Sequence, residues 1–161
     1  MSTPIPEPQA LPAAPVLQAT FEPASPDCNG WLADGARSIR SVPARSGSYA
    51  CKLCADGSRA DFALSHEMGA LEAGRYVFRA YTRKRPQNEA PAATNAFVEA
   101  TTRDGTIVFA ANDTNVRDEW DLLEAIVDVP NGATSLRVQI GAPNAASDQC
   151  VLVDDVSIEK Q

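Results

Sequence analysis

The sequence predicts an all-β fold, an antiparallel β-sandwich of two sheets. Runs rich in β-branched and aromatic residues alternate with turn residues along the chain, and no stretch shows a sustained helical period. A length of 161 residues favours one domain with a real hydrophobic core. Because each sheet must bury an apolar face, roughly ten short strands in one domain predict two sheets packed face to face.

The N-terminal segment differs from the rest of the chain. Five of the 12 prolines lie within residues 1–15. Proline fixes φ and has no backbone donor, so this segment is expected to form an extended Pro-rich arm. The sandwich is expected to occupy residues 16–161. Its expected strands are 16–22, 37–42, 48–55, 60–66, 74–84, 94–102, 106–111, 120–129, 134–141 and 150–159.

Side-chain alternation supports two of these strands most clearly. In "GRYVFRAY", Tyr76 and Phe78 share one face, and Arg79 and Tyr81 lie on the other. The same alternation in "LRVQI", residues 136–140, separates three apolar residues from two polar ones. One face of each strand is therefore expected in the core, and the other facing solvent or a ligand.

Turn signals separate the later strands. Asp104-Gly105 lies between two β-rich runs, which indicates a hairpin. Pro130-Asn131-Gly132 likewise predicts a turn between strands. Residues 65–74, "SHEMGALEAG", are expected to contain at most one turn of helix.

Charge and hydropathy exclude several classes of partner. With 14 Lys and Arg against 21 Asp and Glu, the net charge is −7, which argues against a nucleic-acid ligand. No apolar run approaches the ~20 residues that a membrane span needs. The N-terminus lacks the basic and apolar regions of a secretory signal, so synthesis in the cytoplasm without a signal peptide is expected.

Cys51 and Cys54 have the Cys-x-x-Cys spacing of a zinc ligand pair or a redox dithiol. In a strand, residues i and i+3 point to opposite faces, so these two thiols are expected to face apart. Zinc would need two further ligands, and no helix pattern follows to lower a thiol pKa. The sequence therefore predicts no metal or redox role here, and Cys51 as a small buried hydrophobe.

Six landmarks in order indicate a family. Phe21-Glu22 closes the first expected strand, and Gly30-Trp31 follows. Next come "ARSGSYACKL", "LEAGRYVFRAYTRK", "WDLLEAIVDVPNGATSLRVQI" and "CVLVDDVSIEK". Over residues 16–160 this pattern resembles the jelly-roll carbohydrate-binding modules of the galactose-binding-like superfamily. The resemblance implies a two-sheet jelly-roll β-sandwich, and it implies function only loosely, because this fold hosts many roles.

The resemblance also implies a structural calcium ion near the paired terminal strands. By position, its ligands would be Glu22, Asp154 or Asp155, and the backbone around Ser46 to Ser48. Calcium takes six to eight hard oxygen ligands, which such a set would supply. The alternative is that these carboxylates cap turns or pair with Arg45.

In this fold the first strand runs antiparallel to the last. If Phe21 lies near Val156, residue 28 falls opposite about residue 149, which makes a Cys28–Cys150 disulfide a candidate in oxidising surroundings. Four cysteines do not make a disulfide scaffold, so the compartment stays open.

Exposed polar and aromatic residues are the candidates for holding a glycan, because sugars are gripped by aromatic platforms and hydrogen-bonding groups. They are Arg79, Tyr81, Arg83 and Gln139, with Trp31 as a platform. Each could equally be an ordinary solvated residue. Catalysis is not expected, because the chain has one histidine, no nucleophile motif and no carboxylate pair placed across a cleft.

Two functions are left open by the sequence. The first is a non-catalytic component displayed on a larger particle, such as a phage capsid decoration or tail protein on a virion or extracellular surface. The arm would then contact protein partners in a homo-oligomer, and the module could also adhere to glycans. The second is a stand-alone protein that recognises a polysaccharide through its sheet face.

Overall fold

The computed structural model covers residues 1–161. It describes residues 3, 17–21, 28, 30–42, 44–58, 62–83, 96–102, 107–113, 119–129, 135–142 and 149–161. The expected arm, residues 1–15, lies outside the described residues except at Thr3.

The described residues contain eleven strands and no helix. The strands are β1 Leu17–Ala19, β2 Leu32–Asp34, β3 Ala36–Ser41, β4 Ala50–Ala55, β5 Phe62–Ala70, β6 Gly74–Arg83, β7 Ala96–Thr102, β8 Ile107–Asp113, β9 Asp121–Val129, β10 Ser135–Ala142 and β11 Cys150–Lys160. Accordingly, this part of the chain offers no helix long and apolar enough to cross a membrane.

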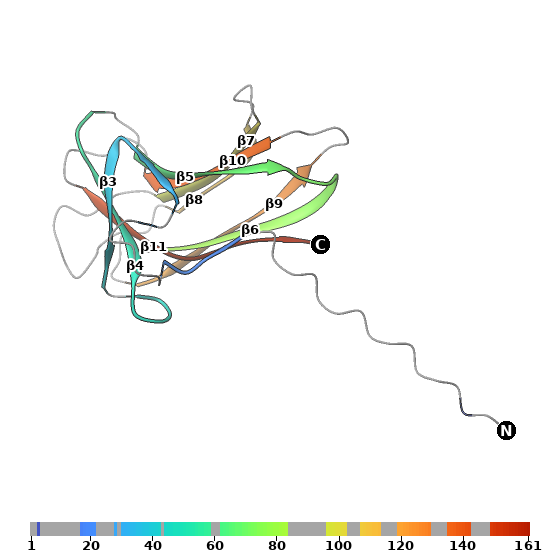
Figure 1. Cartoon of the computed structure of the whole chain (residues 1–161), viewed down its shortest axis with the longest axis horizontal. Helices are drawn as coiled ribbons and strands as arrows, with labels where there is room; N and C mark the ends of the chain where they lie inside the picture. Colours follow the sequence, from blue (N-terminus) through green and yellow to red (C-terminus); the bar gives the residue numbers. More distant parts are fainter. Residues whose placement is uncertain are drawn as a thin grey trace.

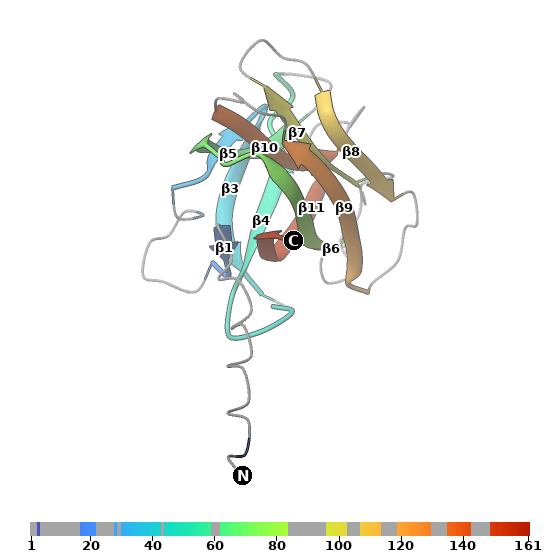
Figure 2. The same cartoon turned by 90° about the vertical axis from the view of Figure 1, so that its right-hand side faces the viewer.

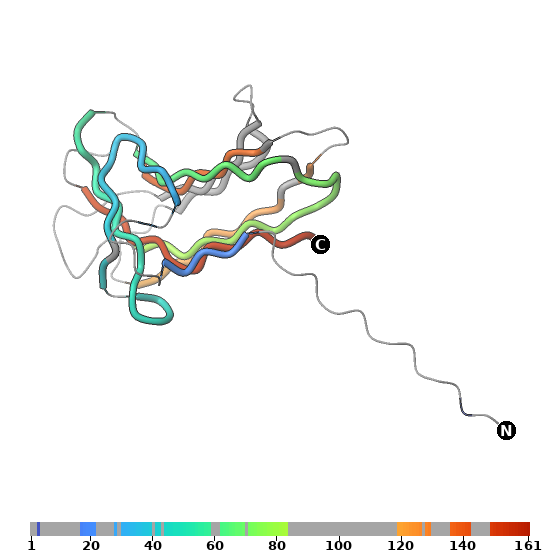
Figure 3. Tube along the Cα trace, viewed as in Figure 1, coloured from blue at the N-terminus to red at the C-terminus, as the bar shows by residue number. Residues whose placement is uncertain are grey.

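The strands form two stacked antiparallel sheets, seen as two layers in Figures 1 and 3. One sheet has the order β3-β4-β11-β6-β9, with β1 also paired to β11. The other has the order β2-β5-β10-β7-β8. Figure 2 shows β6 between β11 and β9. The predicted two-sheet sandwich is confirmed.

Alternation along the strands builds the core, as predicted. Tyr76 and Phe78 on β6 are almost fully buried between the sheets, while Arg79 and Tyr81 on the same strand are partly exposed. Along β10 three apolar side chains within residues 136–140 are buried, and the two polar ones are partly exposed. Burying an apolar side chain of this size contributes about 1.5–3 kcal/mol, so these two central strands supply much of the stability.

Two segments differ from the expectations. Residues 65–74 contain no helical turn, because β5 continues to Ala70 and pairs on both sides, with β10 and β2. The first expected strand is shorter than predicted. β1 ends at Ala19, and Phe21 takes a φ of 57°, a left-handed conformation that ends strand geometry.

Both turn signals lie outside the described residues, but the strands around them are described. The strands that flank Asp104-Gly105, β7 and β8, pair antiparallel with each other, as a hairpin requires. The strands that flank Pro130-Asn131-Gly132, β9 and β10, lie in different sheets. β9 and β10 are therefore not the two strands of one hairpin.

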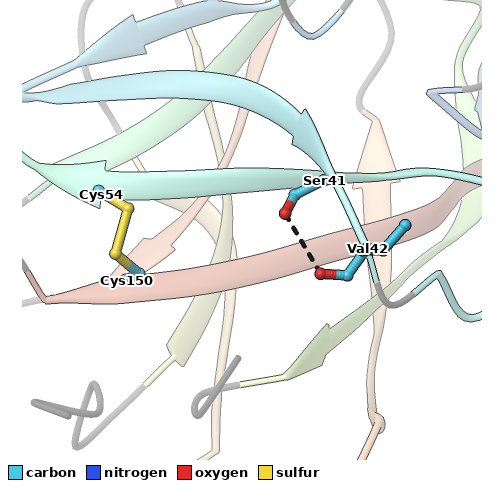
Figure 4. The surroundings of a disulfide bond; sticks show 4 residues. All are labelled: Ser41, Val42, Cys54 and Cys150. Carbon is cyan, nitrogen blue, oxygen red and sulfur yellow. Dashed lines mark hydrogen bonds between the residues drawn. A yellow bond between two sulfur atoms is a disulfide. The ribbon is translucent and has the colours of Figure 1, made fainter. Parts of the chain in front are cut away.

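Two disulfides join the four cysteines, and each uses one member of the Cys-x-x-Cys pair. Cys51 lies on the inner face of β4 and bonds to Cys28 in the core, with a Cα–Cα distance of 5.7 Å. Cys54 bonds to Cys150, which lies directly opposite on β11, with a Cα–Cα distance of 4.1 Å (Figure 4). The prediction that the two thiols face apart is confirmed.

The predicted Cys28–Cys150 disulfide is wrong, and so is the view of Cys51 as a cysteine without a bond. The prediction placed Phe21 near Val156 and continued the first strand straight to residue 28. In the structure Ala19 is the partner of Val156, and the chain leaves β11 after β1. Cys28 therefore reaches the core beside β4 instead of the edge of β11.

Trypsin offers a direct test of the pairing, because it cuts after Lys52, between the two neighbouring cysteines. Under non-reducing conditions we expect peptide 46–52 to be linked to the peptide that carries Cys28, and peptide 53–59 to the one that carries Cys150. Mass spectrometry identifies both linked species. Recovery of a Cys28–Cys150 link, or of unbonded thiols, would contradict this arrangement.

Candidate functional site

A row of polar side chains crosses the outer face of the six-stranded sheet. Gln18 on β1, Ser157 on β11, Arg79 on β6 and Glu124 on β9 are successive cross-strand partners. Such partners point to the same face of a sheet. Because neighbouring strands lie about 4.8 Å apart, the row spans roughly 14 Å. We name these four residues the polar row.

A hollow of about 290 Å³ lies over this row. Three members of the polar row line it, namely Gln18, Ser157 and Arg79. Its other lining residues include Arg45, Ser46, Tyr81, Asp155 and Glu159. We name it the Tyr81 hollow. It brings together residues from β1, β6, β11 and the segment between β3 and β4.

Arg79 is held by two carboxylates. Its Nε donates to Glu124 Oε2 at 2.6 Å, and its Nη1 lies 3.5 Å from Glu159 Oε2. The hydrogen bond to Glu124 raises the pKa of the Arg79 guanidinium above its ordinary value. The guanidinium is thus a fixed, permanently charged donor on the floor of the hollow.

Arg45 covers the ring of Tyr81. Its guanidinium carbon lies 3.3 Å from the ring centroid, and its Nη1 donates to Asp155 Oδ2 at 2.8 Å. Ser46 Oγ donates to the other oxygen of Asp155 at 2.6 Å. One face of the Tyr81 ring is therefore occupied by a cation, and the side chains around it are mutually anchored.

A buried carboxylate holds the turn that carries Arg45. Asp154 has no exposed surface. Its Oδ2 accepts the backbone N–H groups of Arg45 at 2.9 Å and Ser46 at 3.3 Å, and its Oδ1 accepts that of Asp155 at 2.9 Å. Burial raises the pKa of Asp154 from 3.8 to about 6, although these N–H groups oppose the rise.

An irregularity in β11 separates the two neighbouring aspartates. The register with β6 shifts between Asp154 and Ser157, and Asp155 takes a φ of 47°. A β-bulge of this kind turns one side chain away from the regular alternation. As a result Asp154 is buried under the turn, while Asp155 reaches the hollow.

The sequence-predicted glycan residues do not form one cluster. Arg79 and Tyr81 line the hollow together. Arg83 follows on the same strand, and its buried Nε has no hydrogen-bond partner among the described residues. Gln139 lies on the other sheet, opposite Ser65. Trp31 was expected as an exposed platform, but only 8% of its surface is exposed, because it packs against the core.

The predicted calcium ligands are close together where they are described. Asp154 and Asp155 both contact Ser46, whereas Glu22 lies outside the described residues. The carboxylate oxygens are taken by backbone N–H groups, a hydroxyl and Arg45, which is the alternative that the sequence left open. No group of three His, Cys, Asp or Glu side chains that could hold a metal occurs among the described residues, and Glu22 lies outside them, so the calcium ion stays a prediction.

Sequence reasoning missed several residues of the hollow. Gln18, Ser157 and Glu159 were not selected, and Glu124 was not linked to Arg79. The sequence did predict that the first and last strands pair antiparallel. Aligning these two strands with β6 could therefore have placed Gln18 and Ser157 next to Arg79. This alignment cannot be read from the sequence, because the bulge at Asp155 breaks the simple alternation of side chains in "VDDVSIEK".

The raised pKa of Asp154 predicts a pH dependence of stability. The pKa of Asp154 is about 6 in the folded protein and 3.8 in the unfolded chain, so the folded protein binds the carboxyl proton more tightly. The resulting stability is fully present below pH 4 and is lost as the pH rises through 6, a difference of about 3 kcal/mol. In urea titrations with EDTA, the wild-type free energy of unfolding should fall by about 2.4 kcal/mol more from pH 4 to 7 than that of Asp154→Asn. Equal pH dependence in both proteins would refute the assignment.

Metal removal tests the calcium prediction. Arg45 already gives the aspartate pair a positive partner, so we expect the same melting temperature in EDTA and in CaCl₂. MgCl₂ at equal ionic strength serves as the control. A melting temperature raised by CaCl₂ alone would instead support the calcium ion implied by the sequence resemblance.

No family model and no curated protein matches this sequence. Solved structures match its fold. The CBM22-1 xylan-binding domain of Paenibacillus barcinonensis Xyn10C superimposes with a TM-score of 0.67 at 17% identity, covering 94% of this chain and 97% of that domain. TmCBM61, solved in complex with β-1,4-galactotriose, gives 0.65 at 18% identity, covering 92% of this chain and all of the other.

A viral protein also shares the fold. The enzymatically active domain of bacteriophage CBA120 tailspike protein 4 gives a TM-score of 0.58 at 12% identity, covering 83% of this chain and 20% of that one. At these identities a likeness shows the fold and not the ligand. The chain has the jelly-roll β-sandwich fold of carbohydrate-binding modules, as its sequence landmarks predicted.

Proposed function

We propose that this protein is a non-catalytic module that binds a neutral polysaccharide in the Tyr81 hollow and along the polar row. The observation that carries the proposal is a continuous line of hydrogen-bonding side chains across four strands, with a hollow above it. The xylan-binding domain and the galactotriose-bound module with the same fold support it.

The charged side chains of the hollow are ordered before any ligand arrives. Arg79 is fixed by Glu124 and Glu159, and Arg45 by Asp155. Because these long side chains are already positioned, a ligand does not have to immobilise them, which lowers the entropy cost of binding. A guanidinium has five N–H donors, and these contacts use only one or two of them, so donors remain for sugar hydroxyls.

The charge balance favours a neutral ligand. Around the hollow, two guanidinium groups, those of Arg45 and Arg79, face the carboxylates of Glu124, Asp155 and Glu159. The whole chain carries a net charge of −7. An acidic polysaccharide would therefore be repelled, whereas uncharged hydroxyls can both donate and accept.

The two disulfides support a site of action outside the reducing cytosol. Structural disulfides persist in oxidising surroundings such as extracellular space and particle surfaces. Each disulfide has one cysteine on β4, Cys51 or Cys54, and β4 belongs to the sheet that carries the Tyr81 hollow. This agrees with an extracellular or particle-surface location for a polysaccharide-binding protein.

A matched pair of variants tests the site. Arg79→Ala removes a donor from the hollow, whereas Arg75→Ala removes an equivalent ion pair, with Asp128, from the same face of β6 outside the hollow. Exposed ion pairs contribute at most about 1 kcal/mol, so both variants should fold. A charge-assisted hydrogen bond contributes about 1.5–3 kcal/mol, so Arg79→Ala should bind about tenfold or more weakly.

The measurement is native affinity electrophoresis in gels containing soluble xylan or β-1,4-galactan. Wild type and Arg75→Ala should be retarded by at least one of the two polysaccharides, and Arg79→Ala should run as it does without polysaccharide. If neither polysaccharide retards the wild type, or if both variants bind alike, the proposed site is wrong.

The particle-assembly function stays a prediction. The tailspike match supports it only through a shared fold, and the arm expected to contact partners lies outside the described residues. Homo-oligomer formation and the absence of catalysis are likewise still predictions. The absence of catalysis is favoured by the carbohydrate-binding modules that share the fold, which are not catalytic.

A further inference from the structure

A second hollow lies on the other side of β1. It has a volume of about 260 Å³ and is lined by residues 17–20 together with Phe21, Trp31 and His66. We name it the Trp31 hollow. Unlike the Tyr81 hollow, it is lined by three aromatic side chains, two of which, Phe21 and Trp31, belong to the sequence landmarks, and it shares only Gln18 with the polar row.

The aromatic rings of this hollow contact one another. The centroids of Trp31 and His66 lie 5.0 Å apart with an interplanar angle of 34°. Phe21 meets Trp31 edge-on, with centroids 6.2 Å apart. Phe21 also has a φ of 57°, which is strained for a bulky residue, and such strain concentrates at binding sites.

The backbone of Trp31 is hydrogen-bonded to a residue of the buried disulfide. Its backbone N–H donates to the carbonyl of Cys28 at 3.2 Å, and Cys28 is bonded to Cys51 on β4. Only 8% of the surface of Trp31 is exposed. Trp31 is therefore a largely buried part of the wall that packs against the core.

The two hollows share a wall. Gln18 and Thr20 line both of them, so only β1 separates one from the other. Ligand pockets usually measure about 300 to 1,000 Å³, and each hollow alone is at or below the lower end of that range. A ligand that fills both is therefore an extended chain rather than a single ring. The polar row ends at Gln18, which points such a chain toward the Trp31 hollow.

We infer that the Trp31 hollow is a second subsite for the same ligand, an inference that rests on the proposed function. One sugar ring of the chain packs against His66, whose ring contacts the largely buried Trp31, and the following units cross β1 at Gln18 and lie along the polar row. The ligand is thus an oligosaccharide segment that runs across the strands. Single sugars fill only one hollow and bind weakly.

The test compares chain lengths in wild type and in two variants of β5. His66→Ala removes the ring stacked on Trp31, and Met68→Ala, two residues along the same inner face, removes a core contact outside the hollow. The probes are xylo-oligosaccharides or β-1,4-galacto-oligosaccharides of one to six units, matched to the polysaccharide that retards the wild type. Calorimetry gives each affinity, and melting temperatures confirm that both variants fold.

We expect wild-type affinity to rise at least tenfold from two units to six. His66→Ala should lose about tenfold for the six-unit chain and nothing for the two-unit chain, and Met68→Ala should match the wild type. In a Trp120→Phe background Trp31 is the remaining tryptophan, and its fluorescence should change with the six-unit chain only.

The outcomes separate the two proposals. Suppose that Arg79→Ala abolishes binding, but that His66→Ala binds the six-unit chain with wild-type affinity and this chain does not change the fluorescence of Trp31. The second subsite is then refuted and the proposed function stands. If no oligosaccharide of either series binds the wild type, both are refuted.

Discussion

β11 pairs with β4 and β1 along one side and with β6 along the other, and this central pairing sets the register of the whole six-stranded sheet. Through it Cys150 faces Cys54, and Ser157 falls between Gln18 and Arg79. Side chains in a strand alternate with a period of two, so a slip of one residue would exchange the inner and outer faces. Such a slip would break the outer disulfide and the polar row together, and it would expose the apolar side chains that β11 contributes to the core.

The bulge in β11 shows how the sheet converts two adjacent aspartates into two different roles. Asp154 is buried and receives three backbone N–H groups, whereas Asp155 turns outward to Arg45. The buried carboxylate costs about 3 kcal/mol at neutral pH, judged from its raised pKa. In return it fixes the turn that sets Arg45 over Tyr81, and a fixed guanidinium is a better recognition group than a mobile one. The buried carboxylate of Asp154 thus lowers the stability of the protein, but it orders Arg45 and Tyr81 in the hollow.

The disulfides reinforce the same elements from both faces. The pair Cys28–Cys51 closes 23 residues and Cys54–Cys150 closes 96, which in the chain-entropy account contribute about 3 and about 5 kcal/mol. The first lies in the core and anchors the backbone at Trp31, and the second ties the C-terminal end of β4 to the start of β11. The Trp31 hollow and the Tyr81 hollow are thereby attached to one covalent framework, although Trp31 and Tyr81 come from distant parts of the sequence.

Local pattern determined the class of fold and the facing of individual side chains. The alternation in "GRYVFRAY" was sufficient to place Phe78 inside and Arg79 and Tyr81 outside, and the Cys-x-x-Cys spacing was sufficient to show that its thiols diverge. Only the tertiary structure decided which strands lie side by side. It therefore chose the partner of each cysteine, placed Gln139 on the opposite sheet, buried Trp31 and brought Arg45, Ser157 and Glu159 to the hollow. The physical reason is that periodicity is a property of one strand, whereas register, bulges and strand order depend on contacts between segments far apart in the chain.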